Sequence, residues 1–315
     1  MATVLITGGT GLVGKALSGL LTEKGYSVII LTRNPRAMQL SSPANITYSQ
    51  WDIDAQTIDA DALGKADYIV HLAGEGVADK RWNEKRKKEI RQSRTSGSAL
   101  LVKALKEMPN RVKAVVSASA IGWYSEDPEI PNDRPYVETD PPDFGFMGET
   151  CKLWEESIQP VTLLGKRLVK MRTGIVLSKM GGAFAEFIKP VRFGVAGILG
   201  NGKQVISWIH IDDLCRMYVD AIENESLFGP YNAVAPKPVN NKALILQIAK
   251  TLKGNFCLPL HVPSFALKFI LGGMSIEVLR STTVSCEKIR IAGFNFVFPS
   301  IESAVNDLLR KPQTV

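Results

Sequence analysis

The sequence has few of the residues that build metal sites, disulfide frameworks or membrane spans. Its 315 residues include only four cysteines and three histidines, and the cysteines form no Cys-x-x-Cys pair of the kind that binds zinc. Scattered single thiols are typical of the reducing cytoplasm, so we expect a cytoplasmic protein without disulfides or metal. Long apolar runs are also missing, because Lys268 interrupts the longest one before the roughly 18 residues that a membrane helix needs. We therefore expect no membrane partner.

An acidic excess is likewise missing. The chain has 38 lysines and arginines against 31 aspartates and glutamates, a formal net charge of +7. Much of this charge lies in the run DKRWNEKRKKEIRQSR, residues 79–94. The run has neither regular aromatic interleaving nor a recognised nucleic-acid-binding module. We interpret it as the solvated face of a helix and expect no nucleic-acid partner.

Apolar β-branched runs alternate with segments of helical periodicity through most of the chain. The pattern predicts strands at 3–6, 28–31, 45–52, 66–74, 112–120, 167–178, 207–211 and 230–234, and helices at 12–21, 55–64, 82–106, 146–158, 183–193 and 212–224. This alternation predicts an α/β fold, a Rossmann-type doubly wound parallel sheet. From Val239 the chain is mainly helical. We expect a cofactor-binding domain at 1–238, with part of the substrate cavity, and a smaller C-terminal lobe at 239–315.

Three glycines in TGGTGLVG mark the first turn between a strand and a helix. Gly8, Gly11 and Gly14 make a Gly-x-x-Gly-x-x-Gly pattern, with glycine where the backbone bends, approaches a diphosphate and packs against the helix. The free N–H groups at the helix start, at Leu12 and Val13, would hold the diphosphate. We interpret the turn as a dinucleotide site.

The end of the second strand distinguishes between the two nicotinamide cofactors. NAD-binding chains commonly have a carboxylate there, whereas this chain has Thr32 and Arg33. A guanidinium suits the 2′-phosphate of NADP, and the alternative is an ordinary surface arginine. Asp52 ends the third strand. Its carboxylate would either accept a hydrogen bond from the adenine amine or have a role only in the turn.

These residues resemble a known family. TGGTGLVG, HLAGEGVADKRWNEKRKKEIRQSR, SASAIGWY, CKLWEE, RTGIVLS and SWIHIDDL occur in the order found in the epimerase family of atypical short-chain dehydrogenases/reductases, the 39U group, whose bacterial members are labelled nucleoside-diphosphate-sugar epimerases. The segment from Val262 to Val305 resembles the small C-terminal domain of this family. The resemblance implies NADP as the cofactor, and a homodimer by analogy. It also implies cofactor contacts from Thr32, Arg33, Leu72, Ala73, Gly74, Glu89, Arg94 and Val176.

The catalytic tyrosine of the wider superfamily has no counterpart. The superfamily works with a serine, a tyrosine and a lysine four residues after the tyrosine, which lowers the tyrosine pKa. Ser119 and Lys152 occupy the serine and lysine places, although the helix alignment leaves a slip of one residue open. Gly148 or Met147 then stands for the tyrosine. We predict Tyr124 as the substitute proton donor, and its alternative role is to shape the cavity.

Four further residues are candidates for the substrate cavity. Trp123 neighbours Tyr124, and Arg172 would meet an anionic substrate or pair with a carboxylate inside the fold. Trp208 and His210 of SWIHIDDL would cap the cavity or pack in the core. Two functions follow: an NADP-dependent oxidoreductase or epimerase acting on a small polar, nucleotide-sugar-like substrate, or a non-catalytic NADP(H)-binding or redox-sensing protein.

Overall fold

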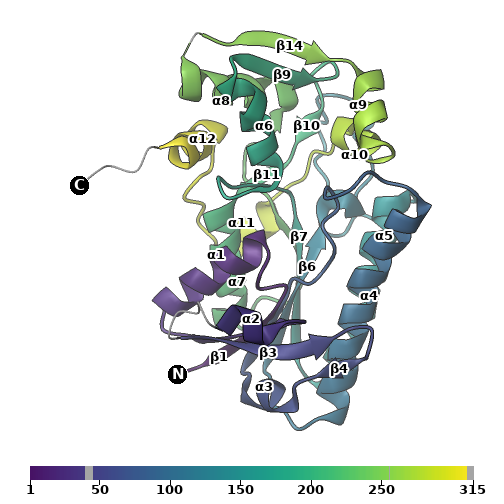
Figure 1. The fold of residues 1–315 in the computed structure, drawn as a ribbon, viewed down its shortest axis with the longest axis vertical. Helices are drawn as coiled ribbons and strands as arrows, with labels where there is room; N and C mark the ends of the chain where they lie inside the picture. The colour runs from purple at the N-terminus through teal and green to yellow at the C-terminus, as the bar shows by residue number, and fades with distance from the viewer. Residues whose placement is uncertain (40–44, 255, 311–315) are drawn as a thin grey trace.

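The core of the computed structural model is an eight-stranded sheet (Figure 1). The structure describes residues 1–39, 45–254 and 256–310. The strand order is β12-β7-β6-β5-β1-β2-β3-β4, and all pairings are parallel except that of β3 with β4. The strands are β1 (Thr3–Thr7), β2 (Ser27–Thr32), β3 (Ile46–Asp52), β4 (Thr57–Ile58), β5 (Tyr68–His71), β6 (Ala114–Ala120), β7 (Arg167–Thr173) and β12 (Gly229–Ala233). The predicted α/β class with a Rossmann-type parallel sheet is confirmed.

Helices connect these strands and cover both faces of the sheet (Figure 1). They are α1 (Leu12–Glu23), α2 (Pro35–Gln39), α3 (Ala60–Lys65), α4 (Glu84–Glu107), η1 (Ile121–Trp123), α5 (Phe146–Ile158), η2 (Gln159–Leu164) and α7 (Ile211–Glu223). The helix predicted at 146–158 is found with those bounds, and residues 84–94 of the basic run form the first part of α4. Among the described residues, no helix combines the length and apolar character needed to cross a bilayer.

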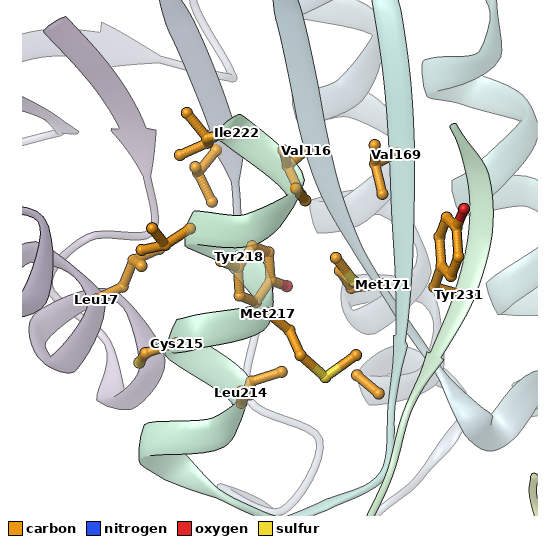
Figure 2. Packing of buried hydrophobic residues seen from close by; sticks show 14 of the residues in the cluster. Leu17, Val116, Val169, Met171, Leu214, Cys215, Met217, Tyr218, Ile222 and Tyr231 are labelled. Carbon is orange, nitrogen blue, oxygen red and sulfur yellow. The ribbon is translucent and has the colours of Figure 1, made fainter. Parts of the chain in front are cut away.

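The two faces of the sheet bury alternate residues of each strand. Val4 and Ile6 of β1 pack with α1 and α7 in one apolar cluster, whereas Leu5 packs with α3 and α4 in the other. This is the period-2 pattern of a strand buried on both sides. Figure 2 shows the first face, where Tyr218 of α7 lies near Leu17 of α1. The carboxyl ends of the parallel strands meet along one edge, where the connecting turns gather.

Two predicted elements differ from the observed ones. Residues 55–64, predicted as one helix, form the short β4 before α3, because the Asp59 side chain caps α3 by accepting the N–H groups of Asp61 and Ala62. The strand predicted at 167–178 is divided at Gly174 into β7 and β8 (Ile175–Leu177). A side chain at Gly174 would overlap the carbonyl oxygen of Ser207, and β8 pairs with β11 (Trp208–His210) outside the main sheet.

The smaller lobe combines segments from both sides of residue 239. Its elements are α6 (Gly182–Arg192), β9 (Val195–Leu199), β10 (Val205–Ile206), β13 (Val239–Asn240), α8 (Asn241–Lys253), β14 (Leu258–Val262), α9 (Ser264–Leu271) and α10 (Met274–Leu279). β14 pairs with β9, and β13 pairs with β10. We call residues 179–206 and 237–279 the upper lobe. Strand pairing therefore crosses the predicted boundary at 239 twice.

The end of the chain returns to the larger part of the molecule. α11 (Glu287–Ile291) and α12 (Ile301–Leu309) follow the upper lobe. Val284, Cys286, Ile289 and Phe294 are buried in the same apolar cluster as α1 and α7, while α12 packs against α8 at the base of the lobe. The C-terminal segment thus connects the lobe to the sheet.

Candidate functional site

The turn between β1 and α1 has glycine wherever a side chain would collide with backbone. A Cβ on Gly14 would overlap the carbonyl oxygen of Gly8, and a Cβ on Gly8 would lie 2.7 Å from the carbonyl carbon of Leu72. Gly8 has a φ of +69°, a conformation that favours glycine. The N–H of Gly11 donates to the carbonyl of Gly8 at 3.0 Å and closes the turn. At Gly8 and Gly14 the turn is thus enclosed by backbone atoms.

Helix α1 begins directly after this turn with an open N-terminus. Gly11 occupies the N-cap and has no side chain to cap the helix, and the first turn has no acidic residue. The N–H groups of Leu12 and Val13 have no intrahelical acceptor, and the positive end of the helix dipole lies at the same place. These features fit a diphosphate, as the sequence predicts.

The residues after β2 lie beside the end of β3. Thr32 is half-buried and its Oγ1 accepts the N–H of Asn34 at 3.4 Å. Arg33 is exposed, and its carbonyl accepts a hydrogen bond from Gln50 Nε2 at 3.1 Å. The backbone of Arg33 is thus held while its guanidinium faces solvent. Its contact with a 2′-phosphate stays a prediction.

Asp52 serves the turn after β3. Its Oδ1 accepts the N–H groups of Asp54 and Ala55 at 2.9 and 3.0 Å. This is the second of the two roles that the sequence left open for Asp52. A contact of Asp52 with an adenine amine remains a prediction.

The segment after β5 passes next to the glycine turn. The N–H of Ala73 donates to Thr7 Oγ1 at 3.2 Å, and Leu72 lies against Gly8. On its other side, a Cβ on Gly74 would lie 3.3 Å from Arg94 Cζ. The backbone of Leu72, Ala73 and Gly74 is therefore placed beside the cradle, as the resemblance implies.

Helix α4 turns two arginines toward this segment. Arg94 Nη1 donates to the carbonyl of Glu75 at 3.1 Å, and Arg94 Cζ lies 4.9 Å from the centre of the Trp154 ring. Glu89 pairs with Arg86, which also pairs with Glu75, at 3.1 and 3.0 Å. Glu89 thus anchors the buried Arg86, a residue that the sequence reasoning did not single out.

Helix α5 presents different residues to β6 from those expected. Lys152 is 52% exposed and lies 3.8 Å from Glu156 on the solvent side of the helix. Met147 and Cys151 face inward: a Cβ on Gly122 would lie 3.2 Å from Met147 Cβ and 3.7 Å from Cys151 Sγ. Lys152 therefore lies on the solvent side of α5 and Cys151, one residue before it, lies on the inward side, while the catalytic role of Lys152 stays a prediction. Burial raises the pKa of Cys151 to about 12, so it is a packed thiol.

Tyr124, which directly follows η1, is fully buried. Its hydroxyl donates to Asn232 Oδ1 at 2.6 Å and accepts from Arg172 Nη1 at 3.1 Å, and its ring stacks on Tyr136. Burial raises the pKa of Tyr124 to about 12, although Arg172 acts in the opposite direction. A proton donor needs access to the substrate and a pKa nearer neutrality. Tyr124 thus lies in a buried polar network, and its assignment as the proton donor stays a prediction.

Ser119, at the end of β6, is held by a buried ion pair. Its hydroxyl donates to Glu155 Oε1 at 2.8 Å. Arg172 donates to the same carboxylate from Nε at 2.7 Å and from Nη2 at 3.1 Å. Burial alone would raise the pKa of Glu155, but hydrogen bonds and charge from Arg172 hold it below its ordinary value. Of the two roles that the sequence left open for Arg172, the structure shows the pairing with a carboxylate inside the fold.

Trp123 of η1 packs against the arginine of this ion pair. Its ring centre lies 3.7 Å from Arg172 Cζ, and its Nε1 donates to the carbonyl of Asp140 at 2.9 Å. Trp123 is half-buried. Val176 of β8 is half-buried as well and packs at the margin of the cluster formed by α1 and α7. Trp123 and Val176 remain candidates to line a cavity at the carboxyl edge of the sheet.

Trp208 and His210 belong to the core. Trp208 is fully buried, and its Nε1 donates to the carbonyl of Lys237 at 2.9 Å. His210 caps α7, because its Nδ1 accepts the N–H of Asp212 at 3.1 Å. The ring proton of neutral His210 then lies on Nε2, 3.4 Å from Asp307 Oδ2. The structure therefore places Trp208 and His210 in the core, the alternative that the sequence left open for them.

Two residues of the buried polar network escaped the sequence reasoning. Glu155 lies four residues after Cys151, on the inward face of α5, and that spacing was its only signal in the sequence. Asn232 lies on β12 beside Arg172, and its N–H donates to Glu138 Oε1 at 2.8 Å. Nothing in the sequence around Asn232 indicates this contact, which brings together residues from three distant segments.

Comparison with known proteins identifies the family. The sequence profile of the NAD dependent epimerase/dehydratase family matches residues 4–145, and that of DUF1731, a domain of unknown function, matches residues 262–308. Epimerase family protein YfhF of Bacillus subtilis is 33% identical over 99% of both chains. Epimerase family protein ML0860 of Mycobacterium leprae is 31% identical over 99% of this chain and 97% of its own.

Solved structures agree with this result. Human epimerase family protein SDR39U1 with NADPH matches at a TM-score of 0.83 and 29% identity, over 97% of this chain and 98% of that one. The nucleoside-diphosphate sugar epimerase from Corynebacterium glutamicum matches at 0.75 and 31% identity, over 98% of this chain and 58% of its own. UDP-glucuronic acid 4-epimerase from Bacillus cereus in complex with NAD, 17% identical with a TM-score of 0.76, shares the fold alone. The chain therefore belongs to the epimerase family, with that family's DUF1731 domain at its C-terminus.

Proposed function

We propose that this protein binds NADP(H) at the carboxyl edge of the sheet, with the diphosphate on the glycine turn. The proposal rests on the combination of a backbone cradle at Gly8, Gly11 and Gly14 with an exposed arginine, Arg33, at the end of β2. A guanidinium there suits a 2′-phosphate, which it can meet with paired charge-assisted hydrogen bonds. The NADPH of the human relative SDR39U1 supports the same cofactor.

We further propose that the protein binds the cofactor but has no tyrosine–lysine proton relay of the kind found in the superfamily. Bound NADP(H) supplies a hydride at its nicotinamide ring. In this chain, Met147 and Cys151 are the α5 residues that face η1, and they have the four-residue spacing of the relay. Methionine has no titratable proton, and burial raises the pKa of Cys151 to about 12. A protein of this kind binds the cofactor and reports its redox state.

The second candidate is an oxidoreductase or epimerase that acts on a small polar, nucleotide-sugar-like substrate. One observation favours it: Ser119 is kept at the end of β6. A serine at that place polarises a substrate oxygen in the superfamily. The printed name of the Corynebacterium glutamicum relative, a nucleoside-diphosphate sugar epimerase, supports the same class.

The cofactor is tested by fluorescence titration with NADPH and NADH. Arg33→Ala should weaken NADPH binding about 10- to 100-fold, because a charge-assisted hydrogen bond contributes roughly 1.5–3 kcal/mol. NADH binding should be unchanged. Arg111→Ala, which removes an exposed arginine next to Asp67, serves as the matched control. Equal losses for both cofactors in Arg33→Ala would refute the assignment of the 2′-phosphate to Arg33.

Turnover separates the two candidate functions. NADPH absorbance is followed with a panel of carbonyl compounds, for the wild type and for Ser119→Ala. Conversion of nucleoside-diphosphate sugars is followed by chromatography of the sugars, because an epimerisation consumes no net NADPH. Tight NADPH binding without turnover supports the binding protein. Turnover that Ser119→Ala abolishes while NADPH affinity is kept would replace it with the enzyme.

A further inference from the structure

The upper lobe carries a large positive charge. Residues 179–206 and 237–279 contain nine lysines and arginines against two glutamates, a formal charge of +7. The rest of the chain sums to a formal charge of zero, because acidic residues elsewhere offset the positive charge of residues 79–94. All nine cationic residues are exposed. They are Lys179, Lys189, Arg192, Lys203, Lys237, Lys242, Lys250, Lys253 and Lys268.

Helix α9 of this lobe carries its apolar side chains on the outside. Phe265 and Phe269 are 77% and 80% exposed, and Ile270 is exposed as well. Leu267 is the one buried residue of the helix. A surface helix normally turns its apolar face to the core, so α9 has an apolar outer face with Lys268 beside it.

The strand before α9 continues this apolar surface. β14 has four exposed residues and one half-buried residue, and its Leu258 and Leu260 project to the same side of the strand. At the start of β14, the N–H of Leu258 donates to the carbonyl of Gly194 at 2.9 Å, which places the exposed Phe193 next to it. Phe256, also exposed, precedes the strand.

These side chains lie at one end of the molecule. β14 runs through Pro263 directly into α9, and Figure 1 shows both elements at the end furthest from the N-terminus. We call this surface the apolar rim; it consists of Phe193, Phe256, Leu258, Leu260, Phe265, Phe269 and Ile270. Lys250 and Lys253 in the last turn of α8 adjoin it, since the N–H of Phe256 donates to the carbonyl of Lys253 at 3.4 Å.

We propose that the upper lobe adsorbs to the surface of an anionic lipid bilayer, with the apolar rim in the headgroup region and the lysines against lipid phosphates. Exposed Phe, Leu and Ile beside lysines are typical of surfaces that lie in a membrane interface. Each lysine near an anionic bilayer strengthens binding about fivefold. Eight of the nine cationic residues are lysines, whereas arginine is the residue that reads and stacks on nucleic-acid bases.

This proposal revises the expectation of no membrane partner. That expectation followed from the lack of a spanning apolar run, which a protein adsorbed to the surface does not need. The rim residues come from the end of α6, the turn after α8, β14 and α9. They form one surface only in the folded chain.

Vesicle co-sedimentation of the full chain tests the proposal. We expect sedimentation with vesicles of phosphatidylcholine and phosphatidylglycerol, little with phosphatidylcholine alone, and weakening as salt shortens the Debye length. Phe265→Ser/Phe269→Ser and Lys250→Glu/Lys253→Glu should each weaken binding at least about tenfold. The matched controls are Leu163→Ser, at a leucine 86% exposed in η2, and Lys103→Glu/Lys106→Glu at the end of α4. Both controls should bind like the wild type.

Three outcomes would overturn the proposal. The first is equal binding to neutral and anionic vesicles, or no vesicle binding at all. The second is a concentration-dependent dimer in sedimentation velocity that only Phe265→Ser/Phe269→Ser dissociates, which would assign the rim to an interface between two copies. The third is binding of a single-stranded oligonucleotide without vesicle binding. Circular dichroism of each variant confirms that the exposed substitutions leave the fold intact.

Discussion

Arg172 and Glu155 form a bidentate ion pair inside the protein, with Nε to Oε1 at 2.7 Å and Nη2 to Oε2 at 3.1 Å. Both side chains are almost fully buried. The pair joins β7 to α5 and fixes Ser119 through the same carboxylate. It therefore connects the stability of the fold with the geometry of the edge where the cofactor is proposed to bind.

Removing one charge of this pair should destabilise the protein strongly. Glu155→Gln leaves the Arg172 guanidinium buried without a full counter-charge, and breaking a buried pair costs about 3–5 kcal/mol of unfolding free energy. Urea unfolding of the purified variant measures this. Glu149→Gln is the control, because Glu149 is exposed and pairs with Arg91 at the surface, where a pair contributes about 0–1 kcal/mol. Similar losses in the two variants would show that the buried pair has no special weight.

Tyr124→Phe should reduce stability and leave cofactor binding unchanged. The substitution removes the hydroxyl between Asn232 and Arg172 and leaves buried polar groups without that partner, at a cost of about 1–3 kcal/mol. Thermal unfolding and NADPH titration of the same sample measure both effects. Tyr136→Phe, which loses a hydrogen bond to the Glu126 carbonyl near the surface, should cost less. Lost turnover at unchanged stability in Tyr124→Phe would support Tyr124 as the proton donor.

Two glycine-to-alanine substitutions in α1 should change different quantities: the one at Gly14 should lower NADPH affinity, and the one at Gly19 should raise stability. Gly14→Ala places a methyl group on the carbonyl oxygen of Gly8, so the turn must open and NADPH affinity should fall more than about tenfold. Gly19→Ala meets no described atom within 4 Å and should raise stability by about 0.5–1 kcal/mol, because alanine is the better helix former. Fluorescence titration and urea unfolding measure the two quantities. Normal NADPH binding by Gly14→Ala would remove the diphosphate from this turn.

His71 should make the protein less stable in mild acid. Burial lowers its pKa from 6.5 to about 4, so between these values the unfolded chain binds a proton that the folded chain does not. The contribution of neutral His71 is complete above pH 6.5 and decreases as the pH falls toward 4, by about 3 kcal/mol in total. Urea midpoints across this pH range test it. His71→Gln should flatten the decrease, whereas His261→Gln, at an exposed histidine, should keep it.

Patterns in the sequence predicted the local structure correctly where a single segment determines it. The turn at Gly8, Gly11 and Gly14 needs glycine because of contacts with its own backbone and with the backbone that follows β5, the strand beside β1. The helix at Phe146–Ile158 follows from its apolar spacing. The order of strands and helices then determines the parallel sheet and its carboxyl edge. The cofactor end of the site is accordingly predictable without the structure.

The surroundings of the residues expected to do chemistry depend on neighbours distant in sequence. On α5, Cys151 lies inward near η1 and Lys152 faces solvent, and the apolar spacing of the helix alone does not show which of the two faces the site. Tyr124 is buried by partners on β7 and β12.

The sequence by itself determined the fold class, the family and the glycine cradle, since each depends on short-range patterns. The tertiary structure alone decided which α5 residues face the site, how Arg172 is neutralised, and that the apolar rim gathers beside exposed lysines of α8 and α9. Those outcomes depend on contacts between distant segments, and periodicity within one segment does not contain them.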